Sequence, residues 1–408
     1  MRVLQVSHLY PHADDPRNGL VVHKQVKGLQ AAGCETKVLC PLPWTPFPIN
    51  CLSEKWRRYS RARPSEVFDD VAVLRPRYLS FPRGWLTASS GSRMYRGIRR
   101  VVEDLYMKFS FELIHAHMGL PDGDAARRLS VDFEVPFVVT FRSTDLDRIA
   151  MRSARNAYVL RDVFTNAEYL IAPSPHLRTA LGDRFDLDAR VIEHGFDPKD
   201  VHVGSSPLLE KYKGRRILLS VSRLEPRKGI DLNLHALRSL LMRYENLLYL
   251  VIGDGPHRSY LEGLVKDLRL EGHVEFIGRL PHRQVMEYMS IGEIFTLPSW
   301  QETFGLVYIE AMAHGKPIIG CRGQGVDGIV REKGTGMLAD PKDVDSLVEV
   351  LDSLLGHPDE ARAIGERARR LVLENYTWER NAEKTLDVYK KVLNSRCDSD
   401  EQTSAGGS

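Results

Sequence analysis

Short apolar runs alternate with segments of helical periodicity along most of the chain, which predicts a repeated β–α order. Apolar runs that read as strands lie at residues 3–6, 36–40, 113–117, 137–141, 169–172, 190–192, 216–222, 249–252, 274–277, 294–297 and 317–320. Strands that alternate with helices indicate parallel sheets. The pattern therefore predicts an α/β protein with two doubly wound, Rossmann-like domains that face each other across a cleft, with ligands at the carboxyl ends of the strands.

The domain boundaries follow from where this pattern pauses. The stretch 195–214 is polar and contains Gly and Pro, which suits a linker. We expect a first domain over 1–196, a second over 197–377 and a last helix over 378–394, for which a return to the first domain and packing on the second are the alternatives. The tail 395–408 is rich in Ser, Asp, Gln and Gly, so it is expected to be disordered.

Composition restricts the class of protein. The 408 residues are 43% hydrophobic and 27% charged, as in ordinary globular chains. No apolar run approaches the roughly 20 residues that a membrane-spanning helix needs, and residues 1–7 show no signal-peptide pattern. The five cysteines are odd in number and lack zinc-ligand spacing, which favours a reducing compartment and a cytoplasmic location.

Basic residues are concentrated in one segment. Residues 53–108 contain 13 Lys or Arg against 6 Asp or Glu, with aromatic residues between them. This composition fits a loop and a basic amphipathic helix on the surface, and fits equally a patch for an anionic membrane face or an anionic acceptor. No recognition motif supports nucleic acid as a partner.

Two glutamates eight residues apart are the most informative feature of the chain. Glu302 follows the predicted strand 294–297, and Glu310 lies about two turns into the helix that begins near Phe304. The start of that helix offers free N–H groups at Gly305 and Leu306, which form an anion site. Two carboxylates beside an anion-binding turn suit a sugar nucleotide, whose hydroxyls need acceptors and whose diphosphate needs donors.

The string from Leu297 to Pro317 resembles the signature of the retaining glycosyltransferases of family four, which have the GT-B fold. Within that family the resemblance is greatest to bacterial members that build cell-surface polysaccharides of the teichuronic acid or exopolysaccharide type, and it covers most of residues 1–375. It implies that Glu302 binds a sugar hydroxyl and that Glu310 binds the ribose. Phe304, Gly305 and Leu306 would line the donor site.

Other matched segments imply further donor contacts. Ser222-Arg223-Leu-Glu-Pro-Arg-Lys228-Gly follows a strand, and the family places its diphosphate-binding Arg and Lys at Arg223 and Lys228. The remaining donor positions implied by the family are Gly19, Gly253, Gly255, Ile277 and Leu280. Gly253-Asp-Gly255-Pro lacks the third glycine of a dinucleotide fingerprint, so that reading is weak.

Candidate residues in the first domain come from strand ends. The sequence His115-Ala-His117 places two rings on one face of a strand, but no further ligand completes a zinc set at convincing spacing. The family match implies that His117 bonds the donor sugar. Arg142 stands where many relatives have a different residue, and we expect Arg142 and Asp145 to contact an anionic acceptor.

The resemblance implies a metal-independent retaining glycosyltransferase without a cofactor. His117, Glu302, Arg223 and Lys228 would be its catalytic residues, and a UDP- or GDP-sugar its donor. The acceptor would be a glycan or a polyprenyl-linked glycan at the inner membrane face, which suggests peripheral membrane association. The acceptor attacks from the face that the leaving diphosphate occupied, as positive groups stabilise the charge growing on that diphosphate.

Alternatives remain at this point. A GT-A enzyme needs a metal-binding Asp-x-Asp, and Asp145-Leu-Asp147 follows a strand, although the same spacing recurs by chance elsewhere. A sugar-nucleotide epimerase or a phosphorylase on the same fold would share the donor site. A non-catalytic sugar-nucleotide-binding protein would bind donor without turnover.

Overall fold

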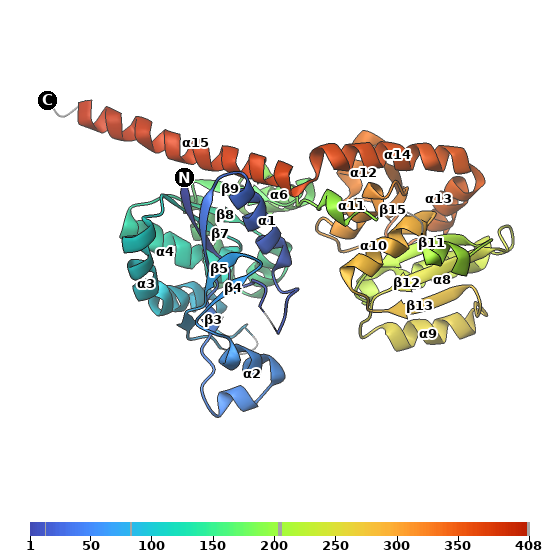
Figure 1. Cartoon of the computed structure of the whole chain (residues 1–408), viewed down its shortest axis with the longest axis horizontal. Helices are drawn as coiled ribbons and strands as arrows, with labels where there is room; N and C mark the ends of the chain where they lie inside the picture. Colours follow the sequence, from blue (N-terminus) through green and yellow to red (C-terminus); the bar gives the residue numbers. More distant parts are fainter. Residues whose placement is uncertain (13, 82–83, 203–205, 406–408) are drawn as a thin grey trace. The chain divides into compact units, whose positions relative to one another are not determined.

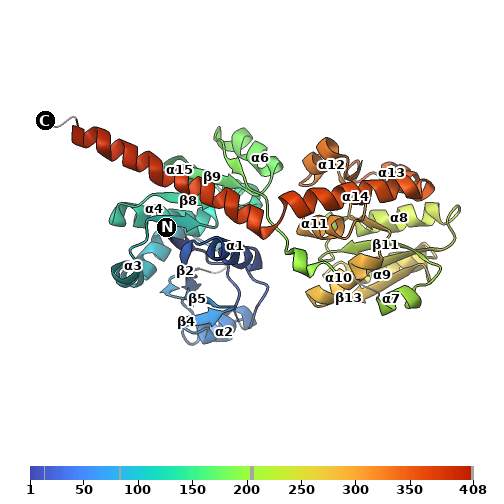
Figure 2. The same ribbon diagram turned by 45° about the horizontal axis from the view of Figure 1, so that its top comes forward.

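The computed structural model describes residues 1–12, 14–81, 84–202 and 206–405, with side chains as far as Arg396. It divides into two compact units, shown in Figures 1 and 2. Unit 1 comprises Met1–His194 together with Trp378–Ser408, and unit 2 comprises Gly195–Thr377. The change from one unit to the other thus falls between His194 and Gly195, two residues before the predicted boundary.

Unit 2 contains a six-stranded parallel sheet in the order β13-β12-β11-β14-β15-β16. Its strands are β11 (Arg216–Val221), β12 (Leu247–Ile252), β13 (Val274–Gly278), β14 (Ile294–Thr296), β15 (Ile318–Cys321) and β16 (Gly336–Ala339). The chain builds outward from β11 in one direction and then restarts at β14 on its other side. This is the Rossmann order, and its reversal point lies between β11 and β14.

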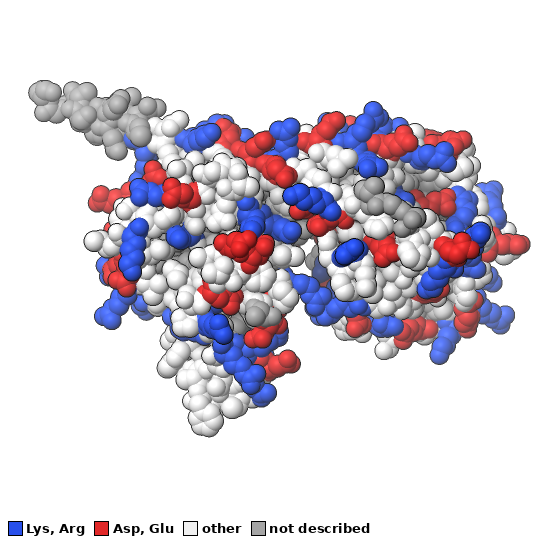
Figure 3. All heavy atoms as spheres, in the orientation of Figure 1, with Lys and Arg blue, Asp and Glu red and all other residues white. Residues whose placement is uncertain are grey.

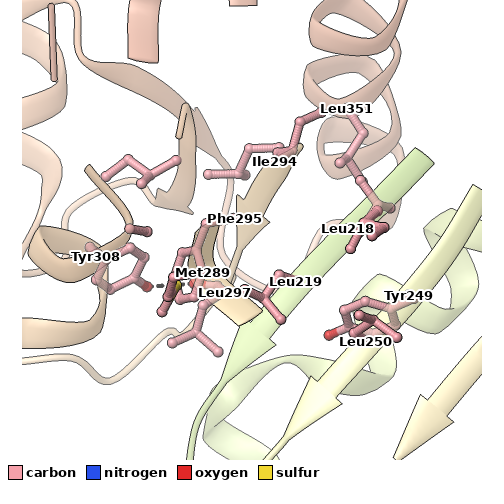
Figure 4. Close-up of a cluster of buried hydrophobic side chains, with 14 of the residues drawn as sticks. Leu218, Leu219, Tyr249, Leu250, Met289, Ile294, Phe295, Leu297, Tyr308 and Leu351 are labelled. Atoms are coloured by element: carbon pink, nitrogen blue, oxygen red, sulfur yellow. Dashed lines mark hydrogen bonds between the residues drawn. The ribbon is translucent and has the colours of Figure 1, made fainter. Parts of the chain in front are cut away.

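Helices precede, connect and follow the strands of unit 2. They are α7 (Pro207–Lys211), α8 (Ile230–Leu240), α9 (Arg258–Asp267), α10 (His282–Ile291), α11 (Leu306–Ala313), α12 (Asp327–Lys333), α13 (Val344–Gly356) and α14 (Pro358–Asn375). Every residue of β12 is buried, as expected of a central strand covered on both faces. Figure 4 shows the apolar core around β11 and β14, where the Tyr308 hydroxyl donates a hydrogen bond to the Leu297 carbonyl.

Unit 1 has an eight-stranded sheet in the order β10-β9-β8-β7-β1-β2-β5-β4. Its strands are β1 (Arg2–Val6), β2 (Glu35–Leu39), β4 (Ser65–Phe68), β5 (Val71–Leu74), β7 (Leu113–Ala116), β8 (Phe137–Thr140), β9 (Tyr169–Ala172) and β10 (Arg190–Val191). The predicted parallel arrangement holds except at the edge, where β4 pairs antiparallel with β5. The strands β3 (Leu42–Pro43) and β6 (Arg77–Tyr78) form a separate pair.

The helices of unit 1 are α1 (Leu20–Ala31), α2 (Glu54–Arg61), α3 (Ser90–Phe109), α4 (Asp124–Phe133), α5 (Ala154–Asn166), α6 (Pro175–Phe185) and α15 (Trp378–Ala405). The last of these joins unit 1 from the far end of the chain and packs against α1 (Figure 1). Val388, Tyr389 and Val392 are buried in a core that also contains Val3 and Leu29.

The prediction of a disordered tail from residue 395 is wrong for residues 395–405, because these residues continue α15. Extending a helix costs little once a packed segment has nucleated it, so polar composition alone did not end the helix. Residues 406–408 lie outside the described part of the chain. None of the described helices combines the length and apolar character required to cross a membrane.

Candidate active site

The reversal point of the unit 2 sheet brings two loops to one edge. The loop after β11 carries Arg223 and Lys228, and the loop after β14 carries Glu302. Because parallel strands end at the same edge, residues distant in sequence meet there. The backbone N–H of Trp300 donates to the Arg227 carbonyl at 3.1 Å, and the Arg227 guanidinium donates to the Gln301 carbonyl at 2.9 Å.

Lys228 and Glu302 form an ion pair at the centre of this edge. The Lys228 Nζ lies 2.5 Å from the Glu302 Oε2, and the two side chains are only 12% and 13% exposed. The Glu302 backbone N–H donates to the side-chain oxygen of Gln324, at 3.1 Å. A cation and a carboxylate held together at this low exposure offer a donor for phosphate beside an acceptor for a hydroxyl.

Helix α11 begins at Leu306, four residues after Glu302. Its N-cap, Gly305, has φ +76°, and an added Cβ would lie 2.4 Å from the Tyr308 ring. Glycine therefore permits both the left-handed backbone and the close approach of the ring. The loop thereby brings the start of α11 close to the Glu302 side chain, and the anion site expected at these N–H groups stays a prediction.

Glu310 lies on α11 and pairs with a histidine from another element. The His282 Nε2 is 3.0 Å from the Glu310 Oε1, and the Glu310 side chain is 17% exposed. His282 is the first residue of α10 and follows the segment that contains Ile277 and Leu280. His282, which contacts Glu310, therefore follows directly on the segment that is expected to meet the nucleotide base. Glu310 is the residue that is expected to bind the ribose.

The glycine turn after β12 holds the segment that carries Arg223. A Cβ added to Gly253 would lie 1.8 Å from the carbonyl oxygen of Ser222. A Cβ added to Gly255 would lie 2.2 Å from the carbonyl oxygen of Leu224. The Leu224 N–H also donates to the Asp254 carbonyl at 3.1 Å. The Arg223 side chain itself is 67% exposed and pairs with Glu225 at 2.8 Å.

The apolar candidates have different environments in unit 2. Phe304 is buried and stacks on Tyr376 at a centroid distance of 6.2 Å. Leu306, Ile277 and Leu280 are partly buried against the same core. The Gly253 N–H donates to the Gly278 carbonyl at 2.9 Å, which ties the turn after β12 to the segment after β13.

His117 follows β7 in unit 1 and is 1% exposed. Its Nε2 lies 2.8 Å from the Gln5 Oε1, whereas its buried Nδ1 has no hydrogen-bond partner among the described residues. Burial, with nearby His115 and two further basic groups, holds the pKa of His117 well below its usual range. The ring is therefore neutral, and an Nε2–H bond to Gln5 leaves Nδ1 as an unused acceptor.

His115 is occupied by structural hydrogen bonds. Its Nδ1 lies 2.6 Å from the Tyr389 hydroxyl, and its Nε2 lies 2.8 Å from the Thr140 hydroxyl. Burial lowers the pKa of His115 to about 3. Among the described residues, no group of three or more His, Cys, Asp or Glu side chains that could hold a metal ion surrounds the histidine pair.

Arg142 and Asp145 follow β8. The Arg142 guanidinium bonds the His194 Nε2 at 2.9 Å, and burial lowers its pKa to about 10. Asp145 is fully buried, and its two oxygens accept the backbone N–H groups of Arg142 and Leu120 at 2.9 and 3.3 Å. Burial raises the pKa of Asp145 to about 6. These contacts hold loops together, and the acceptor role expected for the two residues stays a prediction.

Gly19 is the N-cap of α1 and has φ +69°. An added Cβ would lie 2.2 Å from the Leu9 carbonyl oxygen, so glycine allows the loop to pack under the segment that follows β1. That segment also contains His8, which belongs to none of the motifs in the sequence. The His8 Nδ1 lies 2.9 and 3.0 Å from the two oxygens of the fully buried Asp122.

His8, His282 and Gln324 are the residues at these strand ends that motif reading missed. Each lies shortly after a strand: His8 after β1, His282 after β13 and Gln324 after β15. The rule that ligands bind beyond the carboxyl ends of parallel strands is a signal that could have selected them. It would have selected many other loop residues as well, so only their contacts distinguish them.

Comparisons with known proteins match both halves of the chain. Residues 19–194 match a family model described as "Glycosyl transferase 4-like domain", and residues 206–371 match one described as "Glycosyl transferases group 1". The chain is 27% identical over 360 residues to TuaC of Bacillus subtilis (strain 168), a glycosyltransferase assigned provisionally to teichuronic acid biosynthesis. That match covers 86% of this chain and 88% of the relative.

Solved structures show the same architecture. Sucrose-phosphate synthase of Thermosynechococcus elongatus superposes with a TM-score of 0.77 at 22% identity, covering 97% of this chain and 100% of that one. HepE of Anabaena in complex with UDP gives a TM-score of 0.72 at 17% identity, covering 96% and 100%. At these identities the similarity establishes the fold.

Proposed function

Because the chain belongs to the group 1, family-four glycosyltransferases and has the GT-B fold, we propose that it is a retaining enzyme that transfers a hexose-type sugar from a nucleotide sugar. The acceptor in this proposal is a glycan or a polyprenyl-linked glycan of a cell-surface polysaccharide. The name of the TuaC relative supports this acceptor class. Neither a metal ion nor a cofactor takes part in the proposed reaction.

One observation carries the donor assignment. The Lys228–Glu302 pair lies at the sheet edge where β11 and β14 end, and the chain continues from there through the Gly305 turn into α11, which carries Glu310. Lys228, Arg223 and the first N–H groups of α11 would bind the diphosphate, as positive groups and helix N-termini do. Glu310 would accept hydrogen bonds from the ribose, and Glu302 from a sugar hydroxyl.

The choice of donor has support from structural relatives. HepE has been solved with UDP and with UDP-glucose, and a trehalose-6-phosphate enzyme of E. coli with a fluorinated UDP-glucose. We therefore propose a UDP-sugar, with a GDP-sugar as the alternative. In this proposal the nucleotide base contacts backbone groups near Ile277 and Leu280. Backbone groups are the same in every residue, so the side chains there give little indication of which base binds.

The chemistry follows from where charge develops. As the bond from the sugar to the diphosphate breaks, negative charge grows on the leaving oxygen, and Lys228 and Arg223 stabilise that charge more than the ground state. The acceptor hydroxyl attacks from the face that the diphosphate occupied, and a diphosphate oxygen takes its proton. In this scheme the unused Nδ1 of His117 accepts a hydrogen bond from a hydroxyl of the donor sugar.

A thermal-shift titration without metal tests the donor site. UDP-, GDP- and ADP-sugars are compared on the wild type, on Glu310→Gln and on the control Glu349→Gln, which changes an exposed glutamate of α13. A ligand present at a hundredfold excess over its dissociation constant stabilises by roughly 2.7 kcal/mol. We expect one nucleotide to raise the melting temperature of the wild type and the control, and to lose that effect in Glu310→Gln.

The same titration contradicts the proposal if no nucleotide sugar shifts the wild type, or if Glu310→Gln responds as the control does. A shift that appears only with manganese or magnesium would contradict metal independence. Consumption of the bound donor without an acceptor would favour the epimerase. Donor binding without transfer to any glycan acceptor would favour a non-catalytic binding protein.

A further inference from the structure

Unit 1 contains a pocket of about 890 Å³ that the donor site does not use. It lies between α2, the segment around Phe81 and Thr87, and the turn at 144–152, and it reaches His8 behind β1. Ligand pockets of this size accommodate one or two sugar rings with a substituent. All of its lining residues belong to unit 1, whereas Lys228, Glu302 and Glu310 belong to unit 2.

The charged side chains that line the pocket are all basic. Lys55, Arg148 and Arg152 line it and are exposed, and the lining contains no carboxylate among the described residues. None of these three cations forms an ion pair within the described part of the chain. By contrast, the neighbouring Arg75 is fully buried and pairs with Glu66. Unpaired cations around a concave surface attract anions by their combined field.

Aromatic side chains form much of the remaining wall. Trp56 and Tyr59 contribute from α2, Tyr78 contributes from β6, and Phe81 from the segment that follows it. Trp56 and Tyr59 are half-buried, so part of each ring faces the pocket space. Rings of this kind give a cyclic ligand an apolar surface to pack on while cations bind its charged group.

His8 extends the polar character to the base of the pocket. Because Nδ1 is bound to both oxygens of Asp122, the other ring nitrogen, Nε2, points away from that carboxylate. Burial lowers the pKa of His8, but the charge and hydrogen bond of Asp122 outweigh it, so the net pKa is raised. The contact with Asp122 therefore leaves Nε2 for a ligand, and the ring donates a hydrogen bond from Nε2 when it is protonated.

We propose that this pocket binds the acceptor, and that the acceptor carries a phosphate or a carboxylate next to the sugar ring that is extended. This inference rests on the proposed function. Lys55, Arg148 and Arg152 bind the anionic group, Trp56 and Tyr59 pack on the ring, and the His8 Nε2 donates a hydrogen bond to an oxygen of the acceptor. The cations of this pocket, rather than Arg142, then select for charge, since Arg142 is bonded to His194.

Direct binding measurements test the selection for charge. Calorimetry is performed without donor on the full chain, with glucose 1-phosphate, p-nitrophenyl glucuronide and the neutral p-nitrophenyl glucoside as probes. We expect the anionic probes to bind at least tenfold more tightly than the neutral one at low salt. Lys55→Ala, and the double variant Arg148→Ala/Arg152→Ala, are each expected to weaken the anionic probes by about tenfold.

Arg57→Ala is the matched control, because it removes the same charge from α2 at an exposed residue that does not line the pocket. His8→Ala is expected to weaken all ring-containing probes. A farnesyl-diphosphate-linked glucose distinguishes the source of the anion: tighter binding than glucose 1-phosphate indicates a lipid-linked acceptor, and equal binding indicates a soluble one. Both results support the pocket.

Equal affinity for anionic and neutral probes would overturn the proposal, as would binding of no anionic probe. An Arg57→Ala effect as large as that of Lys55→Ala would show a general charge effect and would also overturn it. Because the probes require no donor, a failed nucleotide titration leaves this result interpretable. Loss of donor binding with intact anion selection would reject the proposed function alone.

Discussion

At Gly305, the absence of a side chain decides whether the turn before α11 can form. Two constraints act on this residue together, a left-handed backbone at φ +76° and a Tyr308 ring that occupies the space of a Cβ. The motif shows that a glycine stands between the two glutamates, but the ring that requires it is identified only by the packing of α11.

We therefore expect Gly305→Ala to abolish donor binding and to destabilise unit 2. The left-handed backbone alone costs roughly 1–2 kcal/mol for a residue with a Cβ. Gly272→Ala is the control, since Gly272 has φ +83° with no atom within 4 Å of an added Cβ. Urea denaturation and the UDP-sugar thermal shift measure both effects. Equal losses in the two variants would show that crowding by Tyr308 does not matter.

His8 gives a pH-dependent contribution to stability. Asp122 raises the net pKa of His8, so the folded state binds this proton more tightly than the unfolded state does. The stabilisation is fully present below the unfolded value of about 6.5, and it is lost as the pH rises through the folded pKa. The pair therefore contributes at pH 6 and contributes less at pH 9.

We expect His8→Ala to lower the free energy of unfolding by about 1–3 kcal/mol at pH 6 and by less at pH 9. His176→Ala, at an exposed residue of α6, should change stability little at either pH. Denaturant titrations of all three proteins at the two pH values provide the comparison. A loss for His8→Ala that is larger at pH 9 would contradict the assignment of the charged pair.

At the scale of the element, α2 and the loop before it form a projecting lobe of unit 1, which we call the α2 lobe (residues 44–63). Within it, Trp44, Phe47 and Leu52 are 55%, 81% and 78% exposed. Figure 3 shows Lys and Arg side chains beside the largely uncharged tip. Apolar side chains bordered by basic ones are typical of elements that bind an anionic membrane surface.

We expect the protein to sediment with vesicles that contain anionic lipid and to remain free with neutral vesicles. Phe47→Ser/Leu52→Ser should reduce this binding about tenfold without a loss of stability, because both side chains are exposed. Met107→Ser is the control, since Met107 is 84% exposed on α3 of the same unit. Unchanged binding by the double variant would reject the α2 lobe as the contact surface.

At the scale of the whole molecule, the last helix of the chain completes the first unit. The Tyr389 hydroxyl lies 2.6 Å from the His115 Nδ1 and accepts a hydrogen bond from the Gln5 amide at 3.2 Å. These contacts connect α15 to β1 and β7, and Gln5 in turn positions His117. The end of the sequence thus supports a candidate catalytic residue near its beginning.

We expect Tyr389→Phe to destabilise unit 1 by about 1–3 kcal/mol, because it leaves buried polar groups of Gln5 and His115 without partners. Tyr249→Phe is the matched control in unit 2, where the Tyr249 hydroxyl bonds Ser220 and Asn233. Hydrogen exchange should show lost protection in β1 and β7 for the first variant, and in β11 and β12 for the second. The same loss in both units for either variant would contradict this division.

The sequence by itself determined the alternation of strands and helices, the family and the placing of Glu302 on a loop and Glu310 on the helix that follows it. These features are local, because the periodicity of apolar residues and the spacing within one loop and one helix record them directly. The strands β3, β4, β5, β6 and β16 were not predicted, and each of them is only two to four residues long. The continuation of α15 past residue 395 likewise had no compositional signal.

Only the tertiary structure decided which distant residues meet. Lys228 with Glu302, His282 with Glu310, and His8 with Asp122 are pairs from separate strand ends, and their partners depend on the order of strands in each sheet. Burial too was decided only by the tertiary structure. Asp122 and Asp145 are acidic residues of the kind usually found at the surface, yet both are fully buried in the fold. Packing sets these relations because it joins side chains across the sheet, where sequence spacing carries no record of proximity.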